Sequence, residues 1–245
     1  MPIVTISRTF AAGGAPVGRE LARRLGAEFL DRNIVAAVAE RSGIPEEEAS
    51  GYDERLPGVW QRVAAALATT AGEMAMPPLP SDELLPAAAV EERLAKITRA
   101  VIEEAAARGN AVIVGRGASF IIGRRPDALH VHLHAPLDAR IRYLLMRIEE
   151  IPEDTRPDAA SLKELCRTVD ARRGEYLRHQ FGVNWLDVTH YDLAIDTGTF
   201  SVEEAVDLVE LAVRLRMGDA AADPAAEAAP ALPNDATPSS RPPAT

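Results

Sequence analysis

The stretch from Thr5 to Gly26, TISRTFAAGGAPVGRELARRLG, contains a short apolar run, a glycine pair and then apolar residues at helical spacing. A loop that follows a strand and opens a helix presents successive backbone N–H groups and the positive end of the helix dipole, which together bind phosphate. Gly13 and Gly14 would let the backbone approach such an anion closely. The stretch therefore predicts either a phosphate-binding loop without its usual lysine or an ordinary tight turn, and further residues must distinguish the two.

The phosphate-loop pattern G-x-x-x-x-G-K-[ST] fits this stretch in two alignments. The first places Gly13, Gly18 and Arg19 on the two glycines and the lysine. Its helix would begin near Glu20 and end at Gly26, in under about two turns, which is too short. This alignment is therefore the less favourable one.

The second alignment, which we prefer, places Gly13 on the second glycine and Arg8 on the first. Gly14 then takes the place of the lysine, and Pro16 that of the hydroxyl residue that binds magnesium. Pro16 suits the first turn of a helix, where its missing N–H has no intrahelical partner to lose. The alignment predicts a loop without a lysine or hydroxyl in the usual places, for which Arg8 or Arg19 supplies the missing cation.

Arginines gather in the later half of a chain whose formal net charge is -10. Arg116 follows directly on the apolar run AVIVG, where a buried cation is costly unless it meets an anion. The other arginines of this region are Arg140, Arg142, Arg147, Arg167, Arg172, Arg173 and Arg178. Taken singly, Arg142 and Arg167 fit solvated helix faces better. The set as a whole favours phosphate chemistry. One guanidinium group can donate two parallel hydrogen bonds to phosphate oxygens, and phosphoryl transfer requires positive charge around the transferred group.

The elements that position these residues alternate between extended and helical patterns. We expect strands at residues 3–6, just before Asp31, and at 111–115, 128–136 and 191–196. We expect helices at residues 16–25, 32–41, 60–69 and 87–107, and from Ser201 to about Met217, where Ser201 and Glu204 fit a capping box. Strands that alternate with long helices predict an α/β fold, in which helices cover both faces of a parallel sheet.

The length of 245 residues, with 47% apolar and 26% charged residues, suits one sizeable domain. We expect this domain at residues 1–218. The prolines of residues 70–86 predict a loop or insertion, and residues 219–245, rich in alanine, proline and small polar residues, predict a disordered tail.

The acidic balance argues against a general binder of nucleic acid or of anionic membranes, because both need a broad basic face. The single cysteine, Cys166, cannot form an intrachain disulfide and is expected to be a buried, small apolar residue. No unbroken apolar run approaches the roughly eighteen residues of a membrane span. These features predict a soluble cytoplasmic protein, and they give no oligomeric state.

Several stretches, in order, resemble the cytidylate kinase-like family of P-loop proteins: TISRTFAAGGAPVGRELARRLGAEFLDRNIV, VIVGRGASFII, LHVHLHAPLDARIRYL and VDARRGEYLRHQFGVNWLDVTHYDLAIDTGTFSVEEAVDLV. The resemblance covers nearly all of Met1 to Met217 apart from the Pro-rich insertion. Relatives in this family open with I-S-R and a G-G loop. The resemblance therefore implies that the absence of the lysine is a trait of the family and not a loss particular to this chain.

The resemblance implies a P-loop NTPase-like parallel sheet with a helical lid. It also implies ATP-dependent transfer of the γ-phosphate to a nucleoside monophosphate, with CMP or dCMP as the first candidates and ATP and Mg²⁺ as cofactors. Magnesium would be held by the nucleotide phosphates, with Ser7 or Thr9 as a weak ligand and Asp31 acting through water, rather than by a metal site of the protein.

The resemblance and the loop together imply three groups of site residues. The ATP phosphates would lie on Ser7, Arg8, Ala11, Ala12, Gly13, Gly14, Ala15 and Arg19. The acceptor would be held by Asp31, Arg32, Arg116 and Arg178. The catalytic group would be Arg8, Arg140, Asp170 and Arg173, of which Asp170 and Arg173 have the D-x-x-R spacing of the family's lid. A spacing of three residues places both side chains on one helix face.

Three positions depart from the family's cytidylate kinases. Gly14 replaces the lysine, Pro16 the hydroxyl ligand, and Gly117 an aspartate that helps to recognise cytosine, which leaves base specificity open. An alternative function follows from these losses. The chain would then be a non-catalytic nucleotide-binding or regulatory protein with a degenerate P-loop.

His130, His132 and His134 alternate along one expected strand and therefore face the same way, a spacing that could bind a metal. No cysteine or acidic partner accompanies them, so packing or an interface is the favoured interpretation. Trp60 and Trp185 are expected to be packing anchors rather than stacking platforms for bases, because the chain lacks a basic stripe beside them.

Overall fold

The computed structural model describes residues 1–31, 87–147 and 157–218, with the backbone alone described at 87–94. Arg32, the expected helices at 32–41 and 60–69, Trp60, the Pro-rich segment 70–86 and the tail 219–245 lie outside the described residues. Within the described ranges, no helix is both long enough and apolar enough to cross a bilayer.

Five parallel strands form one sheet in the order β2-β3-β1-β4-β5. The strands are β1 Ile3–Arg8, β2 Glu28–Leu30, β3 Ala111–Val114, β4 Ala128–His134 and β5 Leu193–Asp196. The helices are α1 Gly14–Leu25, α5 Ala87–Arg108, α6 Ala118–Ile122, α7 Leu137–Arg147, α8 Ala159–Phe181 and α9 Val202–Met217, with a short 3-10 turn η3 at Val188–His190. The predicted parallel α/β sheet is confirmed.

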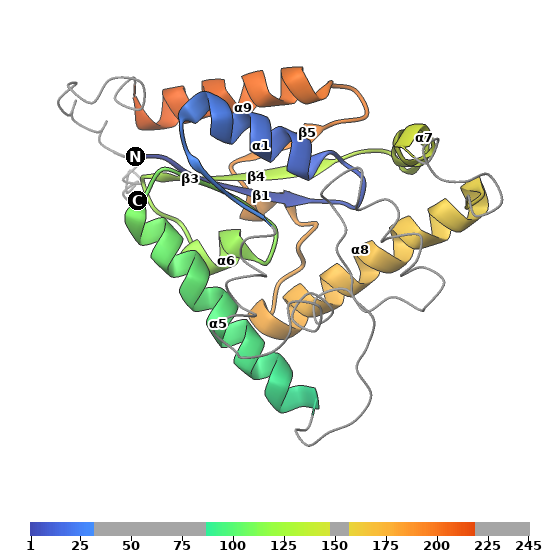
Figure 1. Cartoon of the computed structure of the whole chain (residues 1–245), viewed down its shortest axis with the longest axis horizontal. Helices are drawn as coiled ribbons and strands as arrows, with labels where there is room; N and C mark the ends of the chain where they lie inside the picture. Colours follow the sequence, from blue (N-terminus) through green and yellow to red (C-terminus); the bar gives the residue numbers. More distant parts are fainter. Residues whose placement is uncertain (32–86, 148–156, 219–245) are drawn as a thin grey trace, which may run out of the picture.

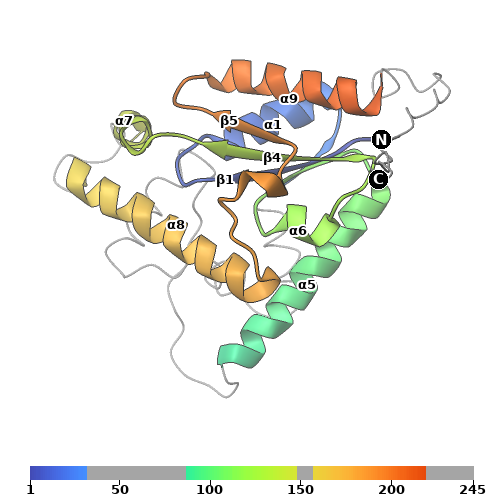
Figure 2. The ribbon, with the colours of Figure 1, turned by 180° about the vertical axis from the view of Figure 1, so that it is seen from behind.

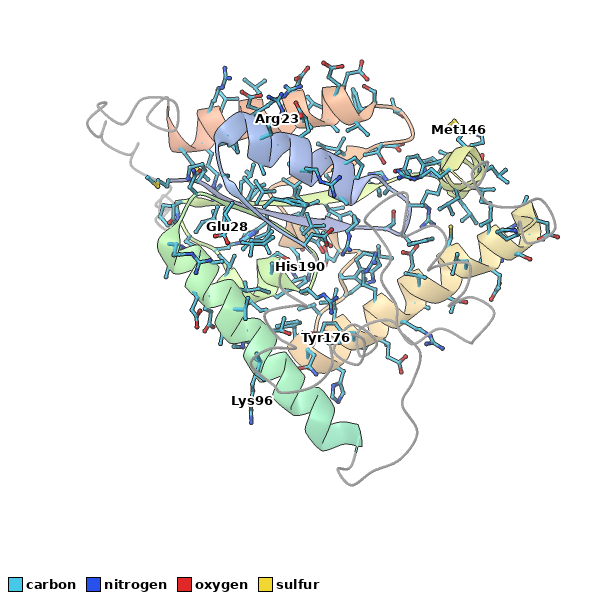
Figure 3. The ribbon with its side chains drawn as sticks, viewed as in Figure 1. Arg23, Glu28, Lys96, Met146, Tyr176 and His190 are labelled. Atoms are coloured by element: carbon cyan, nitrogen blue, oxygen red, sulfur yellow. The ribbon has the colours of Figure 1, made fainter. Side chains whose placement is uncertain are left out.

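Helices cover both faces of the sheet, as the alternation of elements predicted. Helices α1 and α9 lie side by side on one face, and α5, α6 and α8 lie on the other (Figure 1, and from behind in Figure 2). Helices α7 and α8 pack against each other beyond the end of β4 and supply the helical lid expected from the sequence. Figure 3 shows the separation of the faces: Arg23 lies on the outer side of α1, and His190 lies across the sheet from it.

Alternation along β1 decides which face each of its side chains joins. Val4 and Ile6 pack with Leu21 of α1 in one buried cluster, whereas Ile3 packs with Ile102 of α5 in the other. Side chains two residues apart on a strand share a face. Arg8 therefore falls on the α1 face, with Val4 and Ile6. Ser7, the residue before it in β1, falls on the opposite face.

Local signals fix the ends of α1. Gly13, at φ 73° and ψ 22°, precedes the first helical residue, and Gly26, at φ 58°, follows the last. Both residues adopt the left-handed conformation that glycine reaches without steric cost. Because the helix begins at Gly14 and includes Pro16 in its first turn, the alignment that started the helix near Glu20 is excluded.

Other local predictions are confirmed by the structure. The Ser201 hydroxyl accepts from the Glu204 backbone N–H and the Glu204 carboxylate accepts from the Ser201 N–H, which is the predicted capping box of α9. Trp185 is 3% exposed, as a packing anchor should be. Cys166 is fully buried, and burial raises the pKa of its thiol to about 11.

Candidate functional site

The carboxyl ends of β1, β3 and β4 meet at one edge of the sheet. From β1 the chain passes to β2 on one side, and β4 then pairs with β1 on the other side. In doubly wound sheets, ligands bind at the carboxyl edge where the strand order reverses in this way. The loop between β1 and α1, residues 9–13, lies at this point and is called the phosphate loop below.

The sheet holds the phosphate loop from one side. The Thr9 N–H donates to the carbonyl of Leu133 on β4 at 3.0 Å. The Thr197 hydroxyl, directly after β5, donates to the carbonyl of Ala12 at 3.1 Å. Ala11, between these two anchors, has φ 61°, a left-handed conformation that costs an alanine on the order of 1–2 kcal/mol. The loop therefore has a defined, strained conformation, of the kind found at binding sites.

The lid helices hold the phosphate loop from the other side. The Phe10 N–H donates to Asp170 Oδ1 at 2.8 Å, and the Phe10 carbonyl accepts from Arg140 Nη1 at 3.1 Å. Arg140 Nη1 also lies 2.5 Å from Asp170 Oδ2, in an ion pair. Arg173 Nη1 donates to the carbonyl of Arg8 at 2.6 Å. The predicted catalytic group of Arg8, Arg140, Asp170 and Arg173 is therefore assembled around one short piece of backbone.

The side chain of Arg8 lies across the position at which the expected lysine is missing. A Cβ atom on Gly14 would be 2.8 Å from Arg8 Cγ and 3.3 Å from Arg8 Cβ, so the aliphatic stem of Arg8 fills that space. Further along, the guanidinium group fills the space that a side chain on Gly115 would need. Arg8 thus passes over the start of α1 and ends beside the turn after β3.

Arg19, the other candidate for the missing cation, lies elsewhere. It is exposed on α1, and its guanidinium carbon is 5.6 Å from the centre of the Phe29 ring. Of the two arginines that the sequence offered, Arg8 crosses the start of α1 at Gly14, whereas Arg19 lies over the ring of Phe29 in β2.

The turn that carries Arg116 is strained. Gly115, Arg116 and Gly117 have φ values of 80°, 57° and 68°, so three consecutive residues are left-handed. A non-glycine residue in this conformation costs free energy, and such residues concentrate at functional sites. A Cβ on Gly117 would lie 2.5 Å from the Phe181 ring, so an aspartate at this position would collide with that ring as it is packed here. The guanidinium of Arg8 lies against Gly115, the first residue of this turn.

The remaining predicted residues are more scattered. Ser7 lies on the face opposite Arg8, with its Oγ 3.1 Å from the Tyr191 hydroxyl. Asp31 directly follows β2, and Arg178 is exposed in the last turn of α8. The predicted loop residues Ala11, Ala12, Gly13, Gly14 and Ala15 are all buried.

One position in the predicted alignment needs correction. The residue directly after Gly14 is Ala15, so the position of the hydroxyl ligand is held by alanine and not by Pro16, which is the next residue along α1. Thr9 offers another hydroxyl: its Oγ1 is buried, and no described residue hydrogen-bonds to it. Of Thr9 and Ser7, the two hydroxyls proposed as weak magnesium ligands, only Ser7 has a polar partner within the described residues.

The three histidines of β4 take part in packing, as the favoured interpretation predicted. His130 Nδ1 lies 2.7 Å from the Thr5 hydroxyl, and its Nε2 lies 2.9 Å from the Gly123 carbonyl. His132 stacks on Tyr191 with ring centres 4.8 Å apart. Among the described residues, no group of three or more His, Cys, Asp or Glu side chains is arranged to hold a metal ion.

The buried His132 predicts a loss of stability in acid. Burial, assisted by the nearby His134 and Arg173, lowers the pKa of His132 to about 4 from an ordinary 6.5. Between these pH values the unfolded chain binds a proton at His132 that the folded chain does not. The contribution of neutral His132 to the free energy of unfolding is therefore complete above about pH 6.5 and is lost as the pH falls toward 4. His132→Phe, which keeps a ring against Tyr191, should therefore show a smaller decrease in melting temperature between about pH 7 and 5 than the original chain. An unchanged decrease would assign the acid sensitivity to other groups.

Sequence reasoning missed Thr197, Phe10 and Tyr191. The sequence does contain a signal for Thr197, which directly follows the predicted last strand and so belongs to the carboxyl edge. Phe10 acts through its backbone N–H and carbonyl, which are common to all non-proline residues. Tyr191 precedes β5, and its hydroxyl donates to the Trp185 carbonyl at 2.7 Å.

Comparisons with known proteins agree with this architecture. The sequence profile of the cytidylate kinase-like family matches residues 3–199. A cytidylate kinase of Pyrobaculum aerophilum is 24% identical over 207 residues, which are 84% of this chain and 89% of that protein. A cytidylate kinase of Methanosarcina mazei is 26% identical over 113 residues, 45% of this chain. The chain spans 58% of the length of that Methanosarcina relative.

A solved structure shows the same fold. An uncharacterized protein from Eubacterium ventriosum superposes with a TM-score of 0.59 at 17% sequence identity, and the match covers 88% of this chain and 100% of that one. At this identity, the likeness concerns the fold alone.

Proposed function

The chain belongs to the cytidylate kinase-like family, and on that premise we propose that it is an ATP-dependent phosphotransferase that transfers the γ-phosphate of ATP to a nucleoside monophosphate. CMP and dCMP are the first acceptors to test, because the related proteins from Pyrobaculum and Methanosarcina are cytidylate kinases. The observation that carries the proposal is the course of Arg8: its stem crosses Gly14, where the lysine is missing, and its guanidinium lies beside Gly115 at the same carboxyl edge of the sheet.

The phosphates of ATP would lie on the loop and the first turn of α1. The first amides of any α-helix have no intrahelical acceptor, and the helix dipole adds positive potential at that end. Arg8 would provide the charge that a lysine provides in other loops. Its guanidinium lies between the start of α1 and the Arg116 turn, so it is positioned to stabilise charge that develops between the donor and acceptor phosphates.

Magnesium would arrive with the nucleotide. The ion prefers oxygen ligands and keeps several of its waters, so a single protein hydroxyl beside the phosphates is sufficient. The Thr9 hydroxyl, buried and without a partner among the described residues, fits this requirement. Bound in this way, the ion would neutralise phosphate charge.

A non-catalytic nucleotide-binding role is the second candidate. The observation that favours it is Ala15, which leaves the usual magnesium position of the loop without a hydroxyl. A protein of this kind would bind ATP on the same backbone groups and would transfer no phosphate.

A coupled assay of ADP release, with ATP and Mg²⁺ against a panel of nucleoside monophosphates, separates the two candidates. For a kinase we expect turnover with one acceptor, and in Arg116→Ala an acceptor KM raised by on the order of tenfold, because a charged hydrogen bond to the acceptor phosphate is lost. Arg124→Ala, an exposed arginine shortly after α6, is the matched control and should change little. Saturable thermal stabilisation by ATP without turnover on any acceptor would support the binding role instead.

A further inference from the structure

Asp170 and Arg140 lie on different lid helices, yet both are directed at the same backbone unit. Asp170 Oδ1 accepts from the N–H of Phe10, and Arg140 donates to the carbonyl of the same residue. The two side chains also pair with each other at 2.5 Å. Phe10 is 160 residues from Asp170 in sequence, so this contact exists only through the fold.

Both charges are largely withdrawn from solvent. The side chain of Arg140 is 10% exposed and that of Asp170 is 18% exposed. A buried ion pair is strongly destabilised when only one partner is removed, because the other charge is left uncompensated. With its guanidinium committed to the Asp170 carboxylate and the Phe10 carbonyl, Arg140 is fixed in place and holds the loop.

Helix α8 is itself closely packed. Gly174 faces Trp185, and a Cβ at that position would lie 2.8 Å from Trp185 Nε1. The Arg173 guanidinium carbon lies 5.8 Å from the centre of the same tryptophan ring. At its C-terminal end α8 packs Leu177 and Phe181 against Gly117, in the turn that carries Arg116. One helix therefore supports both the phosphate loop and the Arg116 turn.

We propose that Asp170 and Arg140 are positioning residues, which fix the phosphate loop through Phe10 and thereby connect its conformation to helix α8. The inference rests on the proposed function, but it assigns Asp170 and Arg140 a positioning role in place of the catalytic role that the family resemblance implied. They act on nucleotide binding through the backbone of the loop, and Arg8 and Arg116 are the cations beside the phosphates.

The test compares three variants of the full chain. Arg140→Met with Asp170→Leu removes both charges at once, so no unpaired buried charge remains to prevent folding. Asp170→Asn keeps an oxygen that can accept from the Phe10 N–H. Glu164→Gln, on an exposed part of α8, is the matched control.

The first readout is hydrogen exchange of the amides of residues 8–14 without nucleotide. We expect exchange about tenfold faster in the double variant, because its Phe10 N–H has lost its acceptor, and clearly slower exchange in Asp170→Asn than in that variant. The effect should be confined to the loop, with Glu164→Gln unchanged. Exchange in the double variant equal to that of the control would overturn the proposal. This readout needs no turnover, so it stands even if the chain proves not to be a kinase.

The second readout is the division of the kinetic effect between the substrates. Loss of loop positioning should raise the KM for ATP by on the order of tenfold, leave the KM for the nucleoside monophosphate nearly unchanged, and be partly rescued in Asp170→Asn. A raised acceptor KM with an unchanged ATP KM would instead place Asp170 in contact with the acceptor and overturn the proposal. If no acceptor is turned over, the thermal shift induced by ATP replaces the KM, and it should be weakened only in variants whose loop exchanges faster.

Discussion

Arg8→Ala should lower kcat with the identified acceptor by on the order of a hundredfold to a thousandfold, the usual effect of removing one donor to the transferring group. Arg8 is the expected substitute for the lysine because its stem crosses Gly14 and its guanidinium reaches the turn at Gly115. Removing it leaves the backbone amides but takes away the cation that stabilises charge in the transition state. The coupled ADP-release assay at saturating ATP measures the effect.

Two further variants at the arginines sharpen this prediction. Arg8→Lys keeps the charge but loses the planar pair of donors, so it should recover only part of the activity. Arg19→Ala removes an exposed arginine that lies over Phe29, away from the loop, and should leave kcat within about twofold. Equal losses in Arg8→Ala and Arg19→Ala, or no loss in Arg8→Ala, would remove Arg8 from the catalytic role.

Placing the lysine of the common loop pattern at position 14 should also reduce activity strongly. In Gly14→Lys the new Cβ would collide with Arg8 Cγ, close to the backbone where Arg8 has little freedom to move. Overpacking of this kind costs about 1–3 kcal/mol of stability, and here it also displaces the guanidinium. We expect kcat/KM to decrease by more than about a hundredfold, the size of effect expected when one donor to the transferring group is lost.

The same collision predicts a rescue. Arg8→Gly combined with Gly14→Lys removes the obstructing stem and restores both residues of the common loop pattern, so this double variant should recover on the order of tenfold in kcat/KM over Gly14→Lys alone. Gly14→Lys combined with Arg19→Ala is the matched control and should recover nothing. If the two double variants have the same kcat/KM, a lysine at position 14 cannot replace Arg8 as the cation beside the phosphates.

Local patterns in the sequence determined the architecture of the site. The apolar runs, the glycines at the ends of α1 and the capping box of α9 act over a few residues, so the parallel sheet and the start of the phosphate loop could be predicted from them. The same local reasoning preferred the alignment that agrees with the start of α1 at Gly14, although it assigned the hydroxyl position to Pro16 instead of Ala15. Alternation along β1 would also have separated the faces of Ser7 and Arg8.

Only the tertiary structure decided which arginine lies over the start of α1 and what the lid residues contact. Arg8 and Arg19 both flank the glycine pair in sequence, and the choice between them depends on how α1 packs over the end of β1. The D-x-x-R spacing placed Asp170 and Arg173 on one helix face but could not show that this face meets Phe10 and Arg8. The spacing of residues along a helix decides only which side chains share a face of that helix. What that face contacts depends on how whole helices and strands pack around the sheet.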